Sequence, residues 1–168
     1  MTEMAADTPI TEPLSKQYLG LLAQAKSLIA GEYDWVANLA NLSALLFNNL
    51  DDVNWAGFYL IKDDELVLGP FQGQVACIRI ALGRGVCGTA AQSKQTLLVD
   101  DVHQFAGHIA CDAASNSEIV IPIQLNGLVI AVLDIDSPSL ARFTSEDQLG
   151  LEAIVKELEA HYRNETIC

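Results

Sequence analysis

The stretch Glu118-Ile-Val-Ile-Pro-Ile-Gln-Leu-Asn-Gly-Leu-Val-Ile-Ala-Val-Leu-Asp-Ile-Asp136 predicts two strands that pair with each other. Residues 118–124 and 128–135 are rich in aliphatic and β-branched side chains, which favour extended backbone. Asn126-Gly127 lies between them and is a strong hairpin signal, because these residues tolerate the left-handed backbone of a two-residue turn. The stretch therefore predicts an antiparallel β-hairpin.

Outward from this hairpin, shorter patterns predict further strands at residues 55–61, 66–69, 76–80 and 96–99, with Pro70 ending the second of these. Apolar residues at helical spacing predict helices at 14–30, 34–49 and 144–162, and Gly83 to Gly88 bends the chain into a short helix at 89–93. Thr144 and Asp147 fit a capping box at the start of the last helix. The order predicts an α+β domain with a mostly antiparallel sheet, helices packed on one face and loops forming a pocket on the other.

Composition limits the possible partners. The chain has 168 residues, 51% of them hydrophobic, and a net charge of -13, so it is long enough to bury a core. The negative charge disfavours nucleic acid and anionic membrane surfaces. The most apolar stretch is interrupted by polar residues, and the N-terminus lacks a secretory pattern. We therefore expect a cytoplasmic protein with reduced thiols. Residues 1–12 are expected to form a flexible arm, and residues 13–168 a single domain.

Three cysteines, Cys77, Cys87 and Cys111, fall in the middle of the chain with His103 and His108. Cys111 lies in a long connection, residues 100–117, and long loops inside compact domains are usually functional. A zinc site built from these five residues is the weaker interpretation, because no C-x-x-C pair occurs. Another interpretation is that buried cysteines act only as small apolar groups. Cys168 fits that description and Cys87 can fit it, whereas Cys111, in a polar loop-like sequence, fits it less well.

Carboxylates give a second signal. Asp134 and Asp136 share one face of an otherwise apolar strand, and the hairpin register brings Glu118 to about the same level. Three clustered acids repel one another, so at least one should have a raised pKa unless a cation lies among them. Trp55 and Tyr59 share one face of another strand. They either pack in the core or form an apolar wall for a small ligand, with the indole N–H or the phenol as a polar handle.

Several segments together closely resemble the free methionine-(R)-sulfoxide reductases, which are small proteins of the GAF fold. The segments are Gly83-Arg-Gly-Val-Cys-Gly-Thr-Ala-Ala91, Val102-His103, Gly107-His-Ile-Ala-Cys-Asp-Ala-Ala-Ser115, Ser117-Glu-Ile-Val120, Pro122 and Leu133-Asp-Ile-Asp-Ser137. The resemblance runs from about residue 14 to the C-terminus. It implies a single GAF domain over residues 13–168.

The resemblance also implies roles for individual residues. Cys111 would be the nucleophile that attacks free methionine (R)-sulfoxide, Cys77 would resolve the resulting sulfenic acid as a disulfide, and Cys87 could take part in thiol exchange. Substrate-binding residues would be Trp55, Tyr59, Glu118, Asp134 and Asp136. Backbone N–H groups at residues 102–110 are candidates for holding the substrate carboxylate.

The remaining implications concern partners. Thioredoxin or another dithiol would recycle the enzyme, no metal or organic cofactor is required, the chain would form a homodimer, and the activity would protect against oxidative damage. Two alternatives to a methionine sulfoxide reductase remain. One is a non-catalytic GAF module that senses a ligand, and the other is the zinc-binding domain described above.

Overall fold

The computed structural model describes residues 13–108, 114–163 and 165. The expected N-terminal arm and two cysteines, Cys111 and Cys168, lie outside these residues. The elements, in chain order, are α1 (Lys16–Ile29), α2 (Trp35–Asn49), β1 (Trp55–Lys62), β2 (Glu65–Gly73), β3 (Arg79–Ala81), α3 (Gly85–Ser93), β4 (Leu97–Val99), the 3-10 helix η1 (Val102–Gln104), β5 (Ser117–Leu125), β6 (Leu128–Ser137) and α4 (Ser145–Tyr162).

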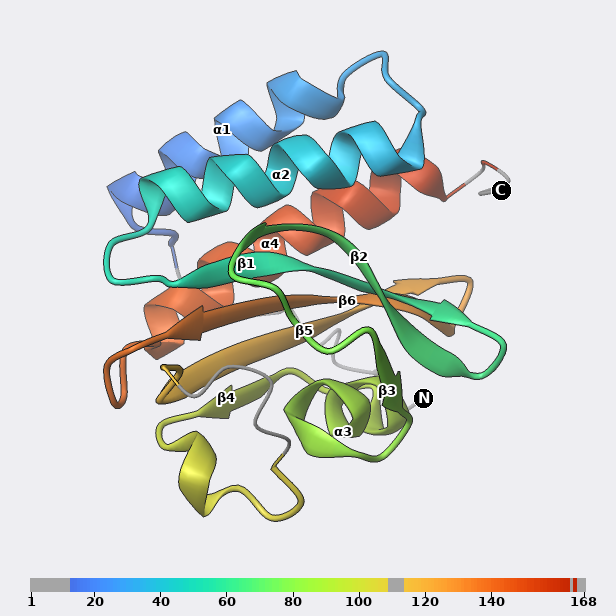
Figure 1. The fold of residues 1–168 in the computed structure, drawn as a ribbon. Coiled ribbons are helices and arrows are strands. Elements are labelled where there is room, and N and C mark those ends of the chain that lie inside the picture. The colour runs from blue at the N-terminus through green and yellow to red at the C-terminus, as the bar shows by residue number, and fades with distance from the viewer. Residues whose placement is uncertain (1–12, 109–113, 164, 166–168) are drawn as a thin grey trace, which may run out of the picture.

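Six antiparallel strands form one sheet in the order β3-β2-β1-β6-β5-β4 (Figure 1). The predicted hairpin is confirmed, and both turn residues have left-handed backbone, with φ 53 at Asn126 and φ 77 at Gly127. The register is also as expected, since Glu118 pairs directly with Asp136 and Val120 pairs with Asp134. The three acids therefore lie at neighbouring positions of the two strands.

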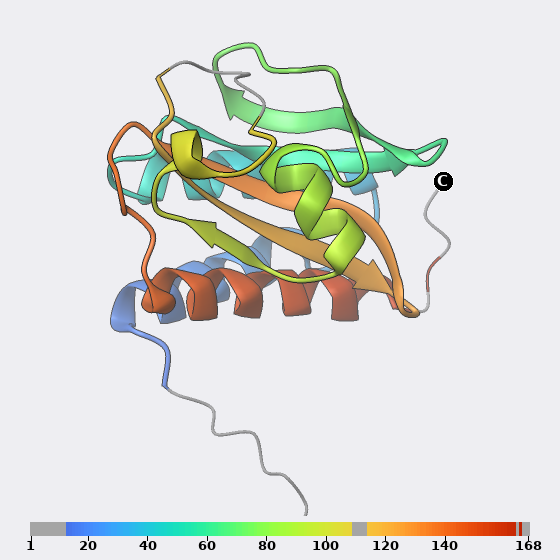
Figure 2. The same ribbon diagram turned by 90° about the horizontal axis from the view of Figure 1, so that it is seen from below.

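Helices α2 and α4 pack against one face of the sheet, and α1 packs against both of them (Figure 1). This face carries the larger core, to which β1 contributes Ala56 and Phe58. The capping box predicted at Thr144 and Asp147 begins α4. The expected separation of helices from loops is incomplete, because α3 packs against β5 and β6 on the opposite face. Figure 2 shows α3 and the connection that contains η1 crossing in front of β5 and β6.

The prediction that Pro70 ends the second strand is wrong. β2 runs on to Gly73, and its pairing with β1 shifts register between Gly57 and Tyr59. This irregularity places Pro70 in a bulge, beyond the part of β2 that β3 covers. A proline without an N–H is tolerated there, because no ladder bond is lost.

Two boundaries near the middle of the chain also differ. β3 covers Arg79–Ala81 rather than residues 76–80, and α3 begins at Gly85 rather than Thr89. Gly88 explains the second difference, because a Cβ there would meet the carbonyl oxygen of Ala81. The absence of a side chain thus lets the first turn of α3 pack directly on β3. No helix among the described residues is long and apolar enough to cross a bilayer.

Candidate active site

A pocket opens on the α3 side of the sheet, over the first half of β1, the start of β5 and the end of β6. Its walls come from five parts of the chain: β1, the segment after β2, the first turn of α3, the connection around η1, and the β5–β6 pair. The residues used below that line it are Trp55, Tyr59, Arg84, Cys87, His108, Glu118, Asp134 and Asp136. All the substrate-binding residues expected from the sequence therefore line one pocket.

The acids form the floor of the pocket. Asp134 is only 5% exposed, and its Oδ1 has no hydrogen-bond partner among the described residues. Burial raises the pKa of Asp134 to about 7, although side-chain hydrogen bonds from Cys87 and Glu118 act in the opposite direction. Burial, followed by the charges of Asp134 and Asp136, raises the pKa of Glu118 well above its ordinary value. Glu118 therefore keeps its proton to a higher pH than an ordinary glutamate, and its protonated carboxyl group can donate a hydrogen bond.

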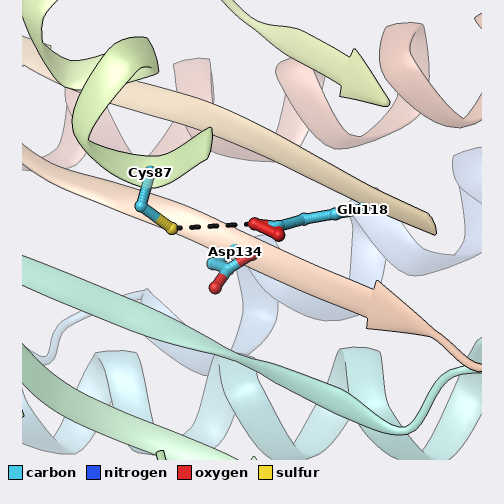
Figure 3. A group of neighbouring side chains, drawn as sticks. All are labelled: Cys87, Glu118 and Asp134. Atoms are coloured by element: carbon cyan, nitrogen blue, oxygen red, sulfur yellow. Dashed lines mark hydrogen bonds between the residues drawn. The ribbon is translucent and has the colours of Figure 1, made fainter. Parts of the chain in front are cut away.

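Cys87 lies in the first turn of α3 and is 4% exposed. Its thiol donates to Glu118 Oε1 at an Sγ–O distance of 4.0 Å, and the side chain of Asp134 lies beside both groups (Figure 3). Burial, followed by the charges of Asp134 and Glu118, raises the pKa of the Cys87 thiol. The thiol is therefore protonated at neutral pH, which makes Cys87 a poor nucleophile.

Trp55 and Tyr59 form an aromatic wall. Their rings stack with centroids 5.9 Å apart, and Phe71 stacks on the other face of Trp55 at 5.1 Å. The polar groups of both side chains donate hydrogen bonds to backbone carbonyls of this chain. The Trp55 indole N–H donates to the Gln74 carbonyl at 3.1 Å, and the Tyr59 hydroxyl donates to the Cys77 carbonyl at 2.9 Å. The wall thus fixes the segment that carries Cys77, which takes part in a disulfide.

Among the described residues, His103 and His108 form no cluster of potential metal ligands with Cys87. His103 contacts Asn116 Oδ1 at 3.1 Å and packs edge-on against His108, with ring centroids 5.8 Å apart. Burial, and then His103, lowers the pKa of His108. The only group of potential metal ligands within the described parts of the chain is Cys87, Glu118 and Asp134, so this set contains neither histidine.

Arg84 is a pocket residue that the sequence interpretation did not single out. It is solvent-exposed, lines the pocket and precedes the first turn of α3, which has no side-chain cap. Helix N-termini carry partial positive charge, so this side of the pocket is positive and the acid floor is negative or neutral. The sequence did contain a pattern from which Arg84 could have been identified. Arg84 lies in the segment Gly83-Arg-Gly-Val-Cys-Gly88, three residues before Cys87.

Comparisons with known proteins agree with this geometry. The family model described as GAF domain matches residues 34–161. Free methionine-R-sulfoxide reductase of Escherichia coli is 58% identical over 142 residues, which cover 84% of this chain and 86% of that protein. A putative GAF sensor protein from Burkholderia vietnamiensis has 57% identity and a TM-score of 0.84, with 86% of this chain and 92% of that chain covered.

Another solved structure, free methionine-R-sulfoxide reductase from Neisseria meningitidis in complex with its substrate, is 45% identical and has a TM-score of 0.84. The match covers 94% of this chain and 96% of that chain. Near-complete coverage on both sides means that the similarity extends across the whole fold, including the pocket.

Proposed function

The chain belongs to the free methionine-R-sulfoxide reductases of the GAF-domain family, and we propose that its pocket reduces free methionine (R)-sulfoxide to methionine. The observation that carries the proposal is the acid floor, where a buried carboxylate, Asp134, has an oxygen without a partner. A buried acceptor of this kind is costly unless a ligand supplies a donor. The ammonium group of a free amino acid is such a donor.

The pocket matches the two ends of a zwitterion. Asp134 and Asp136 hold the substrate ammonium by charge-assisted hydrogen bonds. Arg84, together with the N-terminus of α3, holds the carboxylate, and the wall of Trp55 and Tyr59 contacts the methyl end. Methionine sulfoxide within a peptide has neither charge, so the pocket selects the free amino acid.

Glu118 supplies the proton for the chemical step. Its raised pKa favours the protonated form, which donates a hydrogen bond to the sulfoxide oxygen and makes the sulfur more electrophilic. The thiol of Cys111 attacks that sulfur, and the oxygen is transferred from the substrate sulfur to the Cys111 sulfur as the sulfoxide S–O bond breaks. Methionine leaves, and Cys111 becomes a sulfenic acid. Cys111 lies outside the described residues, so its role rests on the resemblance of the surrounding sequence.

Cys77 completes the cycle. Its thiol condenses with the sulfenic acid, releasing water and forming a Cys77–Cys111 disulfide, which a protein dithiol such as thioredoxin reduces by exchange. The disulfide that Cys77 forms supports this resolving role. Cys87 is a free, buried thiol with a raised pKa, which favours an auxiliary role for it over a direct attack.

The test is consumption of free methionine (R)-sulfoxide by the purified protein with thioredoxin, its reductase and NADPH, or with dithiothreitol. The (S) epimer and a peptide containing methionine sulfoxide are run in parallel. We expect turnover of the free (R) epimer alone, loss of turnover in Cys111→Ser and retention in Cys168→Ser. Undiminished turnover in Cys111→Ser would refute the nucleophile assignment. Ligand binding without turnover by the unchanged protein would instead favour a sensing module.

Two further features belong to the same proposal. Recycling by a dithiol requires a reducing compartment, so we propose that the protein acts in the cytoplasm and counters oxidative damage there. We also propose a homodimer, and light scattering coupled to size-exclusion chromatography measures it directly. A monomer at assay concentration would contradict it.

A further inference from the structure

Cys87, Glu118 and Asp134 meet at one point although they come from α3, β5 and β6. The Cys87 sulfur and one carboxylate oxygen from each acid all lie within 4.8 Å of one another (Figure 3). Cys87 and Asp134 are buried, at 4% and 5% exposed. A thiol and two carboxyl groups held together this closely resemble the ligand set of a metal ion.

A second observation, separate from the clustering of the three side chains, also points to a ligand at Asp134, and a cation answers it as well as the substrate ammonium does. Asp134 Oδ1 is buried and has no hydrogen-bond partner in the described part of the chain. None of the ion pairs among the described residues involves Asp134 or Glu118. The protein therefore provides an acceptor that only a bound donor or cation satisfies.

The thiol is the part that substrate binding does not explain. An ammonium group prefers carboxylate oxygens, and a buried thiol adds little to such a site. A thiolate is in contrast a strong ligand for zinc and for cations of similar softness, whereas magnesium and calcium take oxygen ligands in larger number. Three protein ligands also leave one tetrahedral position open toward the pocket.

We propose that Cys87, Glu118 and Asp134 bind a divalent cation of the zinc class, and that this cation and the substrate exclude each other from the pocket. The exclusion rests on the proposed function, because both ligands use the Asp134 carboxylate. The cation site itself is independent of catalysis. It also differs from the zinc domain considered from the sequence, since it contains neither histidine.

The three ligand atoms lie within 4.8 Å of one another, so they must draw closer together to bind a cation. Zinc bonds of about 2.3 Å to sulfur and about 2.1 Å to oxygen place tetrahedral ligand atoms about 3.4–3.6 Å apart. The Cys87 sulfur and Glu118 Oε1 are 4.0 Å apart without a cation. Binding requires loss of the thiol proton, which the cation favours and which leaves as the metal–sulfur bond forms.

The site is available when Cys77 is oxidised, because Cys87 is a free thiol in a structure in which Cys77 forms a disulfide. The cation experiment therefore uses the oxidised full-length protein, which keeps Cys77 from acting as a ligand and cannot turn over. Cobalt(II) serves as the probe, because a thiolate ligand gives it a near-ultraviolet charge-transfer band.

We expect one cobalt per chain with this band, displacement by zinc, and no displacement by millimolar magnesium. Cys87→Ser should abolish the band, and Asp134→Asn should weaken binding at least tenfold, with circular dichroism confirming the fold of both variants. Cys168→Ser is the matched control for loss of a thiol and should keep the band. A band that survives in Cys87→Ser, or no cobalt binding to the unchanged protein, overturns the site.

Competition is tested in the same protein. Free methionine sulfoxide should weaken apparent cobalt affinity in proportion to its concentration, and a peptide containing methionine sulfoxide should not. Cobalt binding that ignores free methionine sulfoxide overturns the mutual exclusion and leaves the cation site standing. Failure of the proposed function has a different signature: cobalt binds, and the reduced protein does not turn over methionine sulfoxide.

Discussion

Asp134 shows how a single residue connects stability to function. Its carboxyl group is buried at the floor of the pocket, and the pKa of about 7 means that charging it costs free energy in the folded protein. The unfolded chain does not bear that cost, because there the carboxyl group is solvated. Asp134 is thus a destabilising group, and the ammonium group of the proposed substrate would compensate for its cost.

The first prediction follows from this cost. Between pH 4 and pH 7 the folded protein holds a proton on Asp134 that the unfolded chain has lost, so its contribution to stability falls as pH rises. An asparagine at this position does not ionise, so Asp134→Asn avoids the fall in stability at high pH. We expect the melting temperature of the variant to exceed that of the unchanged protein by about 3–8 °C at pH 8. The difference should shrink toward pH 5.

Calorimetry at both pH values measures the effect, and the same variant should lose most of its turnover. Asp100→Asn, at a solvent-exposed aspartate, is the control and should change neither quantity. A melting temperature for Asp134→Asn below that of the unchanged protein at pH 8 would mean that Asp134 stabilises the fold as a carboxylate.

Arg84 carries a second prediction at the residue scale. Losing a charge-assisted hydrogen bond to the substrate carboxylate costs about 1.5–3 kcal/mol. Arg84→Gln should therefore raise KM for free methionine sulfoxide roughly tenfold or more and leave kcat nearly unchanged, as loss of uniform binding does. Steady-state kinetics with the methyl ester, which lacks the carboxylate charge, supplies the check.

The unchanged protein and Arg84→Gln should have the same high KM for the methyl ester. Arg79→Gln is the control, since Arg79 pairs with Glu65 away from the pocket. An equal rise in KM for the acid and the ester would show that Arg84 does not contact the carboxylate.

At the scale of elements, α3 is held in place by the absence of a side chain. Gly88→Ala would drive a Cβ into the carbonyl oxygen of Ala81, and the first turn of α3 must then move away from β3. We expect a loss of about 1–3 kcal/mol in unfolding free energy. Cys87 moves with that turn, so cobalt binding by the oxidised protein should weaken as well.

Gly20→Ala is the matched control, because Gly20 lies inside α1 with nothing within 4 Å of a new Cβ. The same change there should stabilise the protein by about 0.5–1 kcal/mol, through helix propensity alone. Urea denaturation compares the two variants. Equal effects of the two substitutions would show that close packing on β3 does not determine the position of α3.

The same elements show how far sequence alone predicts this fold. The hairpin of β5 and β6 follows from local rules, because Asn126-Gly127 fixes the turn and the register then brings Glu118 opposite Asp136. The course of β2 does not follow, since Pro70 is tolerated only because its position falls in a bulge beyond β3. That condition depends on neighbours distant in sequence.

Prediction of the site has the same limit. The acids and the aromatic wall follow from strand alternation and register, which are periodic. The start of α3 and the position of Arg84 depend on close packing of glycines, whose local preferences are weak. The bonds from Trp55 and Tyr59 to the segment 74–77 are tertiary contacts that no local pattern encodes.

At the scale of the whole molecule, the sheet separates two cores. The core toward α1, α2 and α4 includes Tyr18 and Leu151, and the core on the other face includes Trp55, Tyr59 and Cys87. All pocket residues discussed above face the second core or the connections around it. Changes in the first core should therefore alter stability without altering chemistry.

Tyr18 tests that separation most directly. Its hydroxyl donates to Asp147 Oδ1 at 2.5 Å and ties α1 to the start of α4, where Arg142 and Thr144 donate to the other oxygen of the same carboxylate. Tyr18→Phe leaves one buried carboxylate oxygen unpaired, which costs about 1–3 kcal/mol. We expect the melting temperature to fall by about 3–10 °C.

Turnover at 25 °C should stay within twofold of the unchanged protein, because the pocket lies across the sheet from Tyr18. Tyr33→Phe, at an exposed tyrosine, controls for loss of a hydroxyl and should change neither quantity. The result expected for Asp134→Asn is the opposite, a more stable protein with little activity. If Tyr18→Phe lowered turnover in proportion to stability, the two faces would be coupled through the sheet, and the helices would be part of the catalytic apparatus.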